Sequence, residues 1–554
     1  MVMMSYIILL SMALRGTKMN GAIRKHIQKS SKGDFVSSFQ LVKIFSGELG
    51  EKFVDDVAAN EYRKKAIEQL EPSKLRITNI KIVNFKGFSD LELSFSEKTT
   101  VLVGNNGCGK SSVLEGIKKS MTHLISRLST NSTNGDLIEE HEIKNNCDFS
   151  TIVFNYSLNG VNFSMELSQG SSLSSVKRKG KYTEITDLTS LFKQANDLYS
   201  DFNFPLLASY TVDRANDVTT KDIDKSDEIR DSHIWNKAKA YEKSTTGKAD
   251  FKIFFRWFKE LIEDENSENS EAKSIRILIE QKERDLNSPL IKSIIKKSNK
   301  SEIENDAIEQ YKNEIKELKN RLESLTSQNN LSLDITRSAI YSFLKGFSNL
   351  KLSRKPLDLT ICKGDEQFSV LQLSQGEKSI LALVADIARR LTLLNPSLSN
   401  PLDGTGIVLI DEIDLHLHPS WQQKIIKRLE ETFKNIQFIV TTHSPQVCHT
   451  IDSENIWLIK EGAKFKAPKG VRGAVSSWVL ENLFEVEERP PEDQYTQLLK
   501  EYKELVHEDD YDSKYALEVR RKLINHFGRD YDVLIELDLY IENKEWEKGL
   551  EESK

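Results

Sequence analysis

Apolar and polar residues alternate in two stretches of the first third of the chain, and this period of two predicts β-strands. Residues 75–85 (LRITNIKIVNF) alternate, and the segment LELSF repeats the pattern after a turn. Residues 151–168 alternate on both sides of Asn159 and Gly160, a pair typical of β-hairpin turns. We expect the first two strands to flank the apolar run Thr99–Val103 within one lobe.

Continuous apolar runs predict further strands. After Thr99–Val103, such runs occur at residues 204–212, at Ile407–Ile410 and at Phe438–Thr442. The first of these three ends near Arg214. An arginine at that position can meet a phosphate or can be an ordinary surface residue.

Helical spacing of apolar residues dominates the rest of the chain. Residues 1 to about 70 are predicted to be helical, and the aromatic stripe of residues 250–265 is interpreted as core packing and not as a base-stacking platform. A charged stretch follows, in which heptad spacing predicts a short antiparallel helical hairpin. Its seam comprises Ile308, Tyr311, Ile315, Leu318, Leu322 and Leu325, and, on the preceding helix, Ile275, Leu278, Ile279, Lys282 and Leu286.

Composition narrows the class of protein. The chain has 554 residues, 38% hydrophobic and 29% charged, which is typical of a soluble protein with roughly three or four domains. A net charge of −6 does not indicate a protein that coats nucleic acid, so any such contact requires a local patch or a partner. The four cysteines form no CxxC pair, so we expect neither a zinc site nor disulfides, and a cytoplasmic location fits.

The first residues are apolar over Val2–Leu14, but this run is too short to span a bilayer and no basic segment precedes it. We therefore expect no membrane role. The alternative is a helix that packs on the protein or on a second subunit. The true start of translation can also be Met4, Met12 or Met19.

A P-loop follows the apolar run Thr99–Val103 and precedes residues of helical character. In this motif, glycines let backbone N–H groups converge on phosphates, a lysine reaches the β and γ oxygens, and a hydroxyl ligates Mg²⁺. The chemistry therefore predicts ATP and Mg²⁺ as ligands, with Ser111 on the metal. The residues of the motif are Gly104, Asn105, Asn106, Gly107, Cys108, Gly109, Lys110 and Ser111, with Ser112 next to them.

Two further motifs lie far along the chain. A segment that opens a helix resembles the signature motif of ABC-type ATPases, and it comprises Leu373, Ser374, Gln375, Gly376 and Glu377. The apolar run Ile407–Ile410 then ends in Asp411 and Glu412. In such a Walker B strand, Asp411 is expected to hold the Mg²⁺ shell and Glu412 to polarise the attacking water.

The run Phe438–Thr442 ends in His443, at the position where ABC-type ATPases place a switch histidine that contacts the γ-phosphate. Between the two acidic residues and this histidine lie His416 and His418, beside carboxylates. Their position is that of the D-loop, which crosses the dimer interface in such ATPases. We therefore favour a D-loop over a metal site.

The order GNNGCGKS, LSQGE, LIDEIDLHLHP and TTHSP resembles the AAA15/OLD-like branch of SMC-type ABC ATPases over residues 75–470. More narrowly, the chain resembles the PtuA ATPases of Septu anti-phage systems, including the retron-associated form, in its length, in YTVDR and FFRWFKELIEDEN, and in its C-terminal region. This resemblance implies an α/β fold with a two-lobed ATPase head, a short helical insertion and a helical C-terminal region.

The resemblance also implies how the protein assembles. Two heads would dimerise head to tail, so that the P-loop of one subunit and Ser374, Gln375 and Gly376 of the other enclose each ATP. Lys110, Glu412 and His443 would be the catalytic residues, with Ser111 and Asp411 as metal ligands. The partners implied are an HNH nuclease, PtuB, and, in retron versions, a reverse transcriptase with its multicopy single-stranded DNA.

The chain departs from the pattern of this family at two places. The Q-loop glutamine cannot be assigned, with Gln169 and Gln194 as candidates, and His418 stands where transporter-type D-loops carry Asp. OLD-type nucleases also continue into a Toprim domain, but residues 471–554 offer only two acidic pairs in a stretch that reads as a helix. We therefore expect no intrinsic nuclease. The two pairs are Asp530 with Asp532 and Glu536 with Asp538.

The sequence predicts an ATPase that regulates a partner nuclease in a defence complex. A stand-alone repair or recombination ATPase of the RecF or Rad50 kind is the alternative, and a transporter subunit is disfavoured by the charged helical insertion. The expected domains are an N-terminal helical extension (1–74), lobe I with the P-loop (75–252), a helical insertion (253–335), lobe II with the other motifs (336–470), and a C-terminal partner-docking region (471–554). That last region can equally be a helical lid on the ATPase.

Overall fold

A computed structural model describes residues 21–48, 54–71, 74–130, 132–172, 178–212, 236–249, 251–286, 314–319, 331–354 and 357–552. The chain forms two compact units, Met1–Gly473 and Ala474–Lys554. The first unit contains all the nucleotide-site motifs. Each unit is described by itself below.

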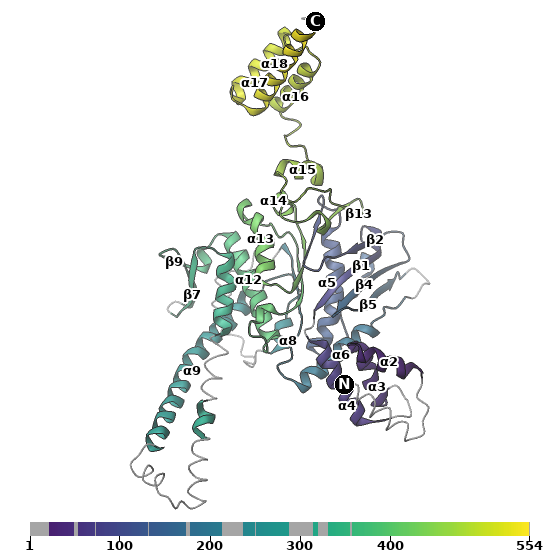
Figure 1. The fold of residues 1–554 in the computed structure, drawn as a ribbon, viewed down its shortest axis with the longest axis vertical. Helices are drawn as coiled ribbons and strands as arrows, with labels where there is room; N and C mark the ends of the chain where they lie inside the picture. The colour runs from purple at the N-terminus through teal and green to yellow at the C-terminus, as the bar shows by residue number, and fades with distance from the viewer. Residues whose placement is uncertain are drawn as a thin grey trace, which may run out of the picture. The chain divides into compact units, whose positions relative to one another are not determined.

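A six-stranded sheet forms the centre of the first unit (Figure 1), with the order β13-β12-β3-β11-β10-β6. All neighbouring strands are parallel except β13, which pairs antiparallel with β12. Four of the strands are buried at every position, which explains why they are continuous apolar runs in the sequence. The bounds are β3 Thr99–Val103, β6 Leu206–Tyr210, β10 Gly406–Ile410, β11 Ile436–Thr441, β12 Ile456–Lys460 and β13 Ala463–Lys466.

The register of this sheet brings distant motifs together. In the parallel pair β10–β11, Ile410 lies opposite Val440, and in the pair β11–β3, Thr441 lies opposite Leu102. Because parallel strands end at the same edge of a sheet, the residues that follow β3, β10 and β11 gather there. These are the P-loop, the acidic pair and the segment that contains His443.

A second sheet is antiparallel, with the order β2-β1-β4-β5. The alternating patterns correctly predicted these strands, and Asn159 (φ 49°) and Gly160 (φ 80°) form the β4–β5 turn. However, the prediction that the first two strands flank β3 is wrong, since β3 lies between β11 and β12. A strand that alternates fits a sheet with one solvated face, whereas β3 is buried throughout. The bounds are β1 Leu75–Phe85, β2 Phe88–Ser94, β4 Phe149–Leu158 and β5 Val161–Gly170.

The helix that follows the P-loop, α5 (Lys110–Ser129), contacts both sheets, namely β4 of the antiparallel sheet and β6 and β11 of the central sheet. A Cβ atom added at Gly116 would contact Ile80, Ile82 and Ile152 of the antiparallel sheet. Gln437 also joins the two sheets, because its side-chain amide forms hydrogen bonds of 2.9 Å with the backbone N–H and the carbonyl of Ile77. Both ends of the P-loop are therefore fixed in packed structure.

The signature helix, α12 (Gln375–Leu394), is held beside the central sheet by a buried ionic cluster. Asp386 accepts hydrogen bonds from Tyr210 of β6 at 2.8 Å, from Arg389 at 2.8 Å and from Arg390 at 2.7 Å. Other elements of this part are α6 Thr183–Leu198, α8 Lys237–Tyr241, α13 Pro419–Thr432, α14 Pro445–Cys448 and a small sheet of β7 Phe347–Arg354, β8 Leu357–Lys363 and β9 Glu366–Ser369.

Helix α9 runs without a break from Phe251 to Leu286 and extends away from the sheets (Figure 1). Its aromatic stripe is core, as predicted, with Phe254, Trp257 and Phe258 buried. Further along, Ile275 and Ile279 pack against Ile315, with Leu318 beside them, and Lys282 forms an ion pair with Glu314 at 2.7 Å. The hairpin seam is thus confirmed at these positions.

The prediction is wrong for one residue of the seam, because Leu278 is 44% exposed. A helix of period 3.6 turns Leu278 away from a narrow two-helix contact that Ile275 and Ile279 already fill. Ile308, Tyr311, Leu322 and Leu325 lie outside the described residues, as do the side chain of Leu286, the apolar N-terminal run and Arg214.

The described N-terminal residues are helical, as predicted, in α2 (Gly21–Ser31), α3 (Phe35–Phe45) and α4 (Asp56–Leu70). The second unit is also helical, with α15 Ser476–Phe484, α16 Gln494–His507, α17 Lys514–Phe527 and α18 Asp532–Glu552. Residues from its last three helices share one hydrophobic core, which includes Tyr502, Leu523 and Leu537. None of the helices in the described parts of the chain is long and apolar enough to cross a membrane.

Candidate nucleotide-binding site

The P-loop connects the end of β3 to the start of α5, and two of its glycines cannot be replaced without a clash. Gly104 (φ 147°) and Gly109 (φ 103°) both have the positive φ that favours glycine. A Cβ atom on Gly104 would lie 2.2 Å from the carbonyl oxygen of Ile459, and one on Gly109 would lie 2.5 Å from the ring of Phe88. The loop is therefore shaped by close packing against β12 and the β1–β2 turn.

Lys110 is the first residue of α5 and is 6% exposed. Its Nζ atom donates hydrogen bonds to the carbonyl oxygens of Gly104 at 2.9 Å and Asn105 at 3.0 Å, and it lies 3.8 Å from the Sγ atom of Cys108. The ammonium group is thus enclosed by the P-loop and bonded to its backbone carbonyl oxygens. The next residue, Ser111, is exposed, so its hydroxyl is accessible at the start of the helix.

Asp411 and Glu412 follow β10, and one hydroxyl contacts both of them. The Oγ1 atom of Thr441 donates to Oδ1 of Asp411 at 2.5 Å and accepts from the backbone N–H of Glu412 at 2.7 Å. Glu412 has a positive φ of 48°, which is uncommon for a residue with a side chain. The acidic pair is therefore positioned by the end of the neighbouring strand β11.

His443 lies two residues beyond β11. Burial first, and then the positive charge of Lys110, lower the pKa of His443 below its usual value, while Asp414, Glu412 and Asp411 act in the opposite direction. Such effects indicate that these charged groups lie near the imidazole. The structure therefore brings Lys110, Asp411, Glu412 and His443 together within one chain.

The signature segment begins α12 with a capping box. The backbone N–H of Ser374 donates to Glu377 at 2.9 Å, and Ser374 accepts from the N–H of Glu377 at 3.3 Å. Lys363 of β8 forms an ion pair with Glu377 at 2.9 Å. A Cβ atom on Gly376 would lie 2.5 Å from the carbonyl oxygen of His416, so the signature segment abuts the D-loop of its own chain.

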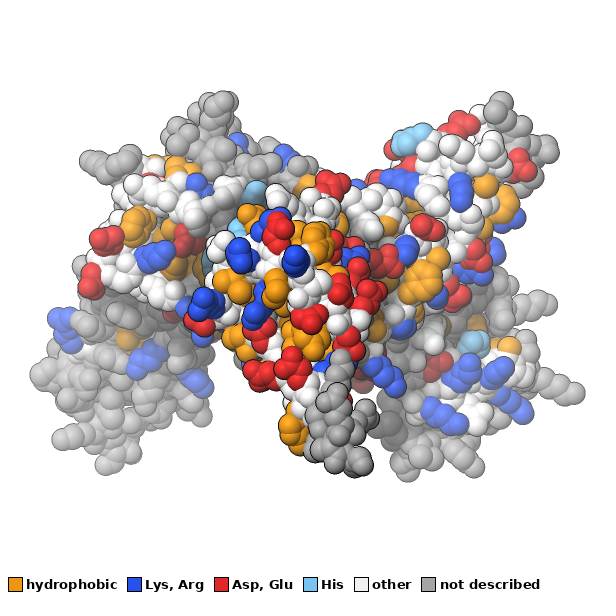
Figure 2. Space-filling view, turned by 90° about the horizontal axis from the view of Figure 1, so that it is seen from above, with side chains coloured by type: hydrophobic (Ala, Val, Ile, Leu, Met, Phe, Trp, Pro, Cys, Tyr) orange, Lys and Arg blue, Asp and Glu red, His pale blue; other side chains and the backbone are white. Residues whose placement is uncertain are grey.

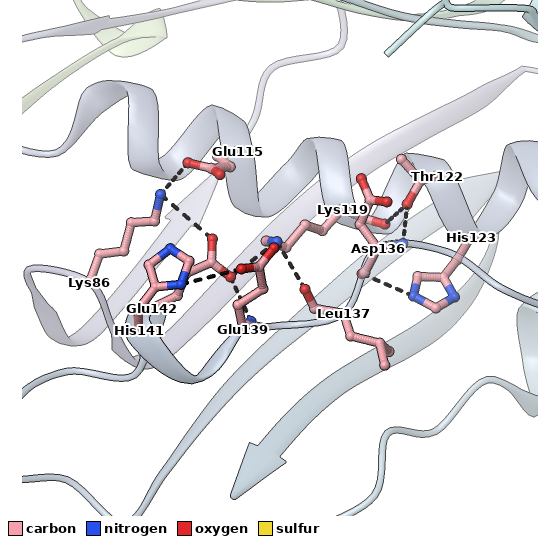
Figure 3. Close-up of polar contacts among 10 residues, drawn as sticks. All are labelled: Lys86, Glu115, Lys119, Thr122, His123, Asp136, Leu137, Glu139, His141 and Glu142. Atoms are coloured by element: carbon pink, nitrogen blue, oxygen red, sulfur yellow. Dashed lines mark hydrogen bonds and ion pairs between the residues drawn. The ribbon is translucent and has the colours of Figure 1, made fainter. Parts of the chain in front are cut away.

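An ionic cluster that no sequence pattern predicted supports α5 and the β1–β2 turn (Figure 3). Lys86, from this turn, pairs with Glu115 of α5 and lies 3.6 Å from the buried carboxylate of Glu142. Lys119, one turn further along α5, lies 3.1 Å from Glu142 and donates to the carbonyl of Leu137 at 2.9 Å. These residues come from three separate segments, so their proximity depends on tertiary structure alone.

The two Q-loop candidates differ in their surroundings. Gln194 lies on α6 and accepts a hydrogen bond from Arg63 of α4 at 3.2 Å, so it faces the N-terminal helices. Gln169 is half-buried near the end of β5, and its side chain donates to the carbonyl of Gly170 at 3.0 Å. Neither contact involves the P-loop, and the Q-loop assignment stays open.

His418 caps α13 through the backbone N–H of Ser420 at 3.3 Å, and His416 has a positive φ of 62°. No group of three or more His, Cys, Asp or Glu residues that could hold a metal occurs among the described residues. In the C-terminal unit, the helix that the sequence predicted for residues 532–550 is α18. There Asp538 forms an ion pair with Arg520 at 2.7 Å.

Comparison with known proteins agrees with this geometry. Residues 75–448 match the family model of the AAA ATPase domain, AAA_15. The chain belongs to this family. It is also 56% identical over 531 residues to the Retron Ec83 probable ATPase of Escherichia coli, across 96% of this chain and 98% of that protein.

A shorter similarity links the chain to the Septu protein PtuA of Bacillus mycoides, with 48% identity over 73 residues, which are 13% of this chain and 10% of that protein. Among solved structures, the SMC head bound to the C-terminal winged-helix domain of ScpA matches 70% of this chain and 96% of its own, with 17% identity and a TM-score of 0.35. The resemblance to PtuA-type ATPases of the Septu and retron kind is confirmed, and the protein is an ATPase.

Proposed function

We propose that the protein binds ATP between two copies of its head and that the state of the nucleotide controls a partner nuclease in an anti-phage defence complex. The observation that carries this proposal is the convergence of Lys110, Asp411, Glu412 and His443 at one edge of the central sheet. The relationship to a retron ATPase and to a Septu protein supports the defence context.

The residues present fit a magnesium ion together with the triphosphate. A Mg²⁺ site of this kind uses one hydroxyl, one carboxylate and phosphate oxygens, and an accessible Ser111 and an oriented Asp411 supply the protein's share. When bound, the ion neutralises charge on the β- and γ-phosphates.

Each residue of the P-loop edge then has a defined task. Lys110 would exchange its two loop carbonyls for the β- and γ-phosphate oxygens, which are better acceptors for an ammonium group. Glu412 would orient the attacking water in line with the γ-phosphate, and His443 would contact that phosphate. The lowered pKa of His443 keeps the free imidazole neutral at pH 7, so the ring donates one hydrogen bond there without adding a charge.

The second half of the site would come from another subunit. Ser374, Gln375 and Gly376 begin α12, and the N–H groups at the start of a helix favour an anion. Within one chain, Gly376 abuts the D-loop carbonyl of His416, and the neighbouring Glu377 forms an ion pair with Lys363 of β8. We infer that they meet the γ-phosphate held by a second copy, which makes hydrolysis depend on dimerisation.

The C-terminal unit is our candidate for docking the nuclease. Residues 474–554 contain 22 acidic and 11 basic residues, so the unit suits a partner with a basic surface and disfavours direct contact with DNA phosphates. Helix α18 adds an apolar stripe of Ile535, Leu539 and Trp546, whose spacing of four and seven places them on one exposed face. Figure 2 shows hydrophobic, acidic and basic side chains exposed next to one another on the C-terminal unit.

The experiment that tests this function is co-expression with an HNH nuclease from the same gene neighbourhood. We expect the two proteins to co-purify, and DNA cleavage by the complex to differ between ATP and no nucleotide. A neighbourhood without a nuclease gene, or cleavage that is independent of ATP, contradicts the proposal and favours a stand-alone repair ATPase. For the retron reverse transcriptase and its DNA, we propose the helical insertion around α9 as the contact.

A further inference from the structure

We propose that Thr441 is a positioning residue for ATP hydrolysis, acting through both acidic residues of the Walker B strand. This inference rests on the roles proposed above for Asp411 and Glu412. It adds to the hydrolysis machinery a residue of the TTHSP segment to which the sequence pattern assigned no role, because a threonine at the end of a strand is common in any sheet.

The register of the central sheet places Thr441 beside the acidic pair. Ile410 lies opposite Val440 in the parallel pair β10–β11, so Asp411 and Thr441 are the next residues of the two strands. Thr441 is fully buried, with an exposed fraction of 0%. Its hydroxyl is therefore shielded from water, and the strand register determines which residues lie beside it.

The hydroxyl makes two hydrogen bonds of opposite direction. It donates to Oδ1 of Asp411 at 2.5 Å, and it accepts from the N–H of Glu412 at 2.7 Å. The first bond fixes the rotation of the Asp411 carboxylate, which is the group proposed above as a metal ligand. The second bond holds the backbone of Glu412, whose φ of 48° is disfavoured for a residue with a Cβ atom.

The neighbouring threonine, Thr442, makes different contacts, so substitutions can test the roles of the two threonines separately. The Oγ1 atom of Thr442 donates to Oδ1 of Asp414 in the D-loop and accepts from the N–H of Ser444. Gln422 continues this second set, since it accepts from Ser444 at 2.7 Å and donates to the carbonyl of Leu417 at 2.9 Å. Thr441 therefore links β11 to Asp411 and to Glu412 through one side chain, whereas Thr442 links β11 to the D-loop.

Replacing the hydroxyl by a methyl group tests the inference with little change in volume. In Thr441→Val, Asp411 loses a donor and the Glu412 N–H loses its acceptor, whereas the P-loop is unchanged. Residues that orient a metal ligand typically contribute about 10- to 100-fold to metal affinity or activity. We expect kcat to fall about 10-fold or more, while the affinity for ATP measured without metal changes by less than about 3-fold.

Metal affinity gives a readout that does not depend on turnover. The probe is Mn²⁺, titrated by electron paramagnetic resonance in the presence of a non-hydrolysable ATP analogue. We expect Thr441→Val to weaken Mn²⁺ binding about 10-fold, and Thr441→Ser, which keeps the hydroxyl, to restore both Mn²⁺ affinity and kcat to within about 3-fold of the original chain.

The control for general destabilisation is Thr189→Val. Thr189 is a buried threonine on α6 whose hydroxyl donates to the carbonyl of Ile185 at 2.8 Å, outside the contacts described for the site. The inference is overturned if Thr441→Val keeps normal kcat and Mn²⁺ affinity, if it resembles Thr189→Val in both, or if Thr441→Ser fails to restore them. Normal turnover by Glu412→Gln would instead contradict the proposed function, so the two failures are distinguishable.

Discussion

Lys110 shows at the scale of a single residue how the site is prepared for a nucleotide. In the described structure its ammonium group bonds two carbonyl oxygens of its own loop at 2.9 and 3.0 Å. A phosphate oxygen carries more negative charge than a carbonyl oxygen, so binding ATP exchanges weaker acceptors for stronger ones. The loop keeps its shape meanwhile, because Gly104 and Gly109 are packed against backbone and ring atoms.

Replacing Lys110 by alanine should therefore abolish ATP binding. A hydrogen bond to a charged group contributes roughly 1.5–3 kcal/mol, and Lys110 is expected to make at least two, so we expect affinity to fall about 100-fold or more. Equilibrium binding of a fluorescent ATP analogue measures this loss. Lys98→Ala, an exposed lysine just before β3, is the matched control and should bind normally. Binding within about 3-fold of normal for Lys110→Ala would refute the assignment.

His123 gives a prediction for stability against pH. It is 2% exposed, and burial first and the charge of Arg127 second lower its pKa to about 4. In the unfolded chain its pKa is about 6.5, so between pH 6.5 and 4 the unfolded state binds a proton that the folded state does not. Stability contributed by neutral His123 is therefore lost as the pH falls through this window.

We expect the melting temperature of the protein to fall more between pH 7.5 and 5 than that of His123→Gln, which has no imidazole to protonate. His141→Gln is the control, since His141 is 73% exposed, and it should follow the original chain. Thermal unfolding at several pH values measures the difference. Equal slopes for the protein and His123→Gln would contradict the assigned burial.

The sequence could predict residues that follow buried strands but not residues that act through register. Asp411, Glu412 and His443 each come directly after or within two residues of an apolar run, and Lys110 is identified by the P-loop motif, so the linear sequence pattern is sufficient for all four. Thr441 and the pair Lys86–Glu142 depend on which strands and loops are neighbours in space. That information is absent from a single sequence.

At the scale of elements, the proposed sharing of ATP between two heads depends on the start of α12. Ser374 caps this helix, and Gly376 lies too close to the D-loop carbonyl of His416 to carry a side chain. The N-terminal end of the helix thus presents small residues and N–H groups, as expected of a surface that receives a phosphate from outside the chain.

We expect Ser374→Arg to leave ATP binding to a single head intact but to abolish ATP-dependent dimerisation and to reduce hydrolysis at least about 100-fold. The arginine is too large for a closed interface, and Lys110 is untouched. Light scattering and an ATPase assay on the same sample measure both effects. The control is Ser369→Arg, at the start of the 3₁₀ turn that precedes the motif. A Ser374→Arg protein that dimerises and turns over normally would exclude the shared site.

Helix α9 shows why element boundaries are harder to predict than element types. The aromatic stripe and the heptad positions predicted two helical stretches, and the structure joins them in one helix of 36 residues. The intervening residues are charged and polar, so they carry no apolar period, yet they continue the helix. The prediction also assigned strands β1 and β2 to the wrong sheet, because an alternating pattern predicts that a segment is a strand but not which sheet it joins.

The C-terminal unit has its own core, so removing residues 474–554 should leave the ATPase unit folded. We expect this truncation to abolish co-purification with the nuclease while ATP hydrolysis persists. Leu539→Glu, in the exposed stripe of α18, should have the same effect. Leu517→Glu, at an exposed position of α17, is the matched control and should still bind the nuclease. Nuclease binding that survives the truncation would move the docking site elsewhere, and loss of ATPase activity would favour a lid.

At the scale of the whole molecule, the first unit contains every nucleotide motif, but in two groups. One group lies where β3, β10 and β11 end, and the other lies at the start of α12 beside the D-loop. A second copy would supply the complementary group to each site. ATP binding would thereby become an assembly step, and hydrolysis would release the two heads.

The most direct measurement of this account is the mass of Glu412→Gln in solution with and without ATP and Mg²⁺, by multi-angle light scattering. Without the Glu412 carboxylate, hydrolysis should slow about 100-fold or more while ATP binding is not weakened. The shared-site account therefore predicts an ATP-dependent doubling of mass that persists for hours. Lys110→Ala should show no change under the same conditions. An unchanged mass for Glu412→Gln at saturating ATP, or hydrolysis at the normal rate, would contradict the account.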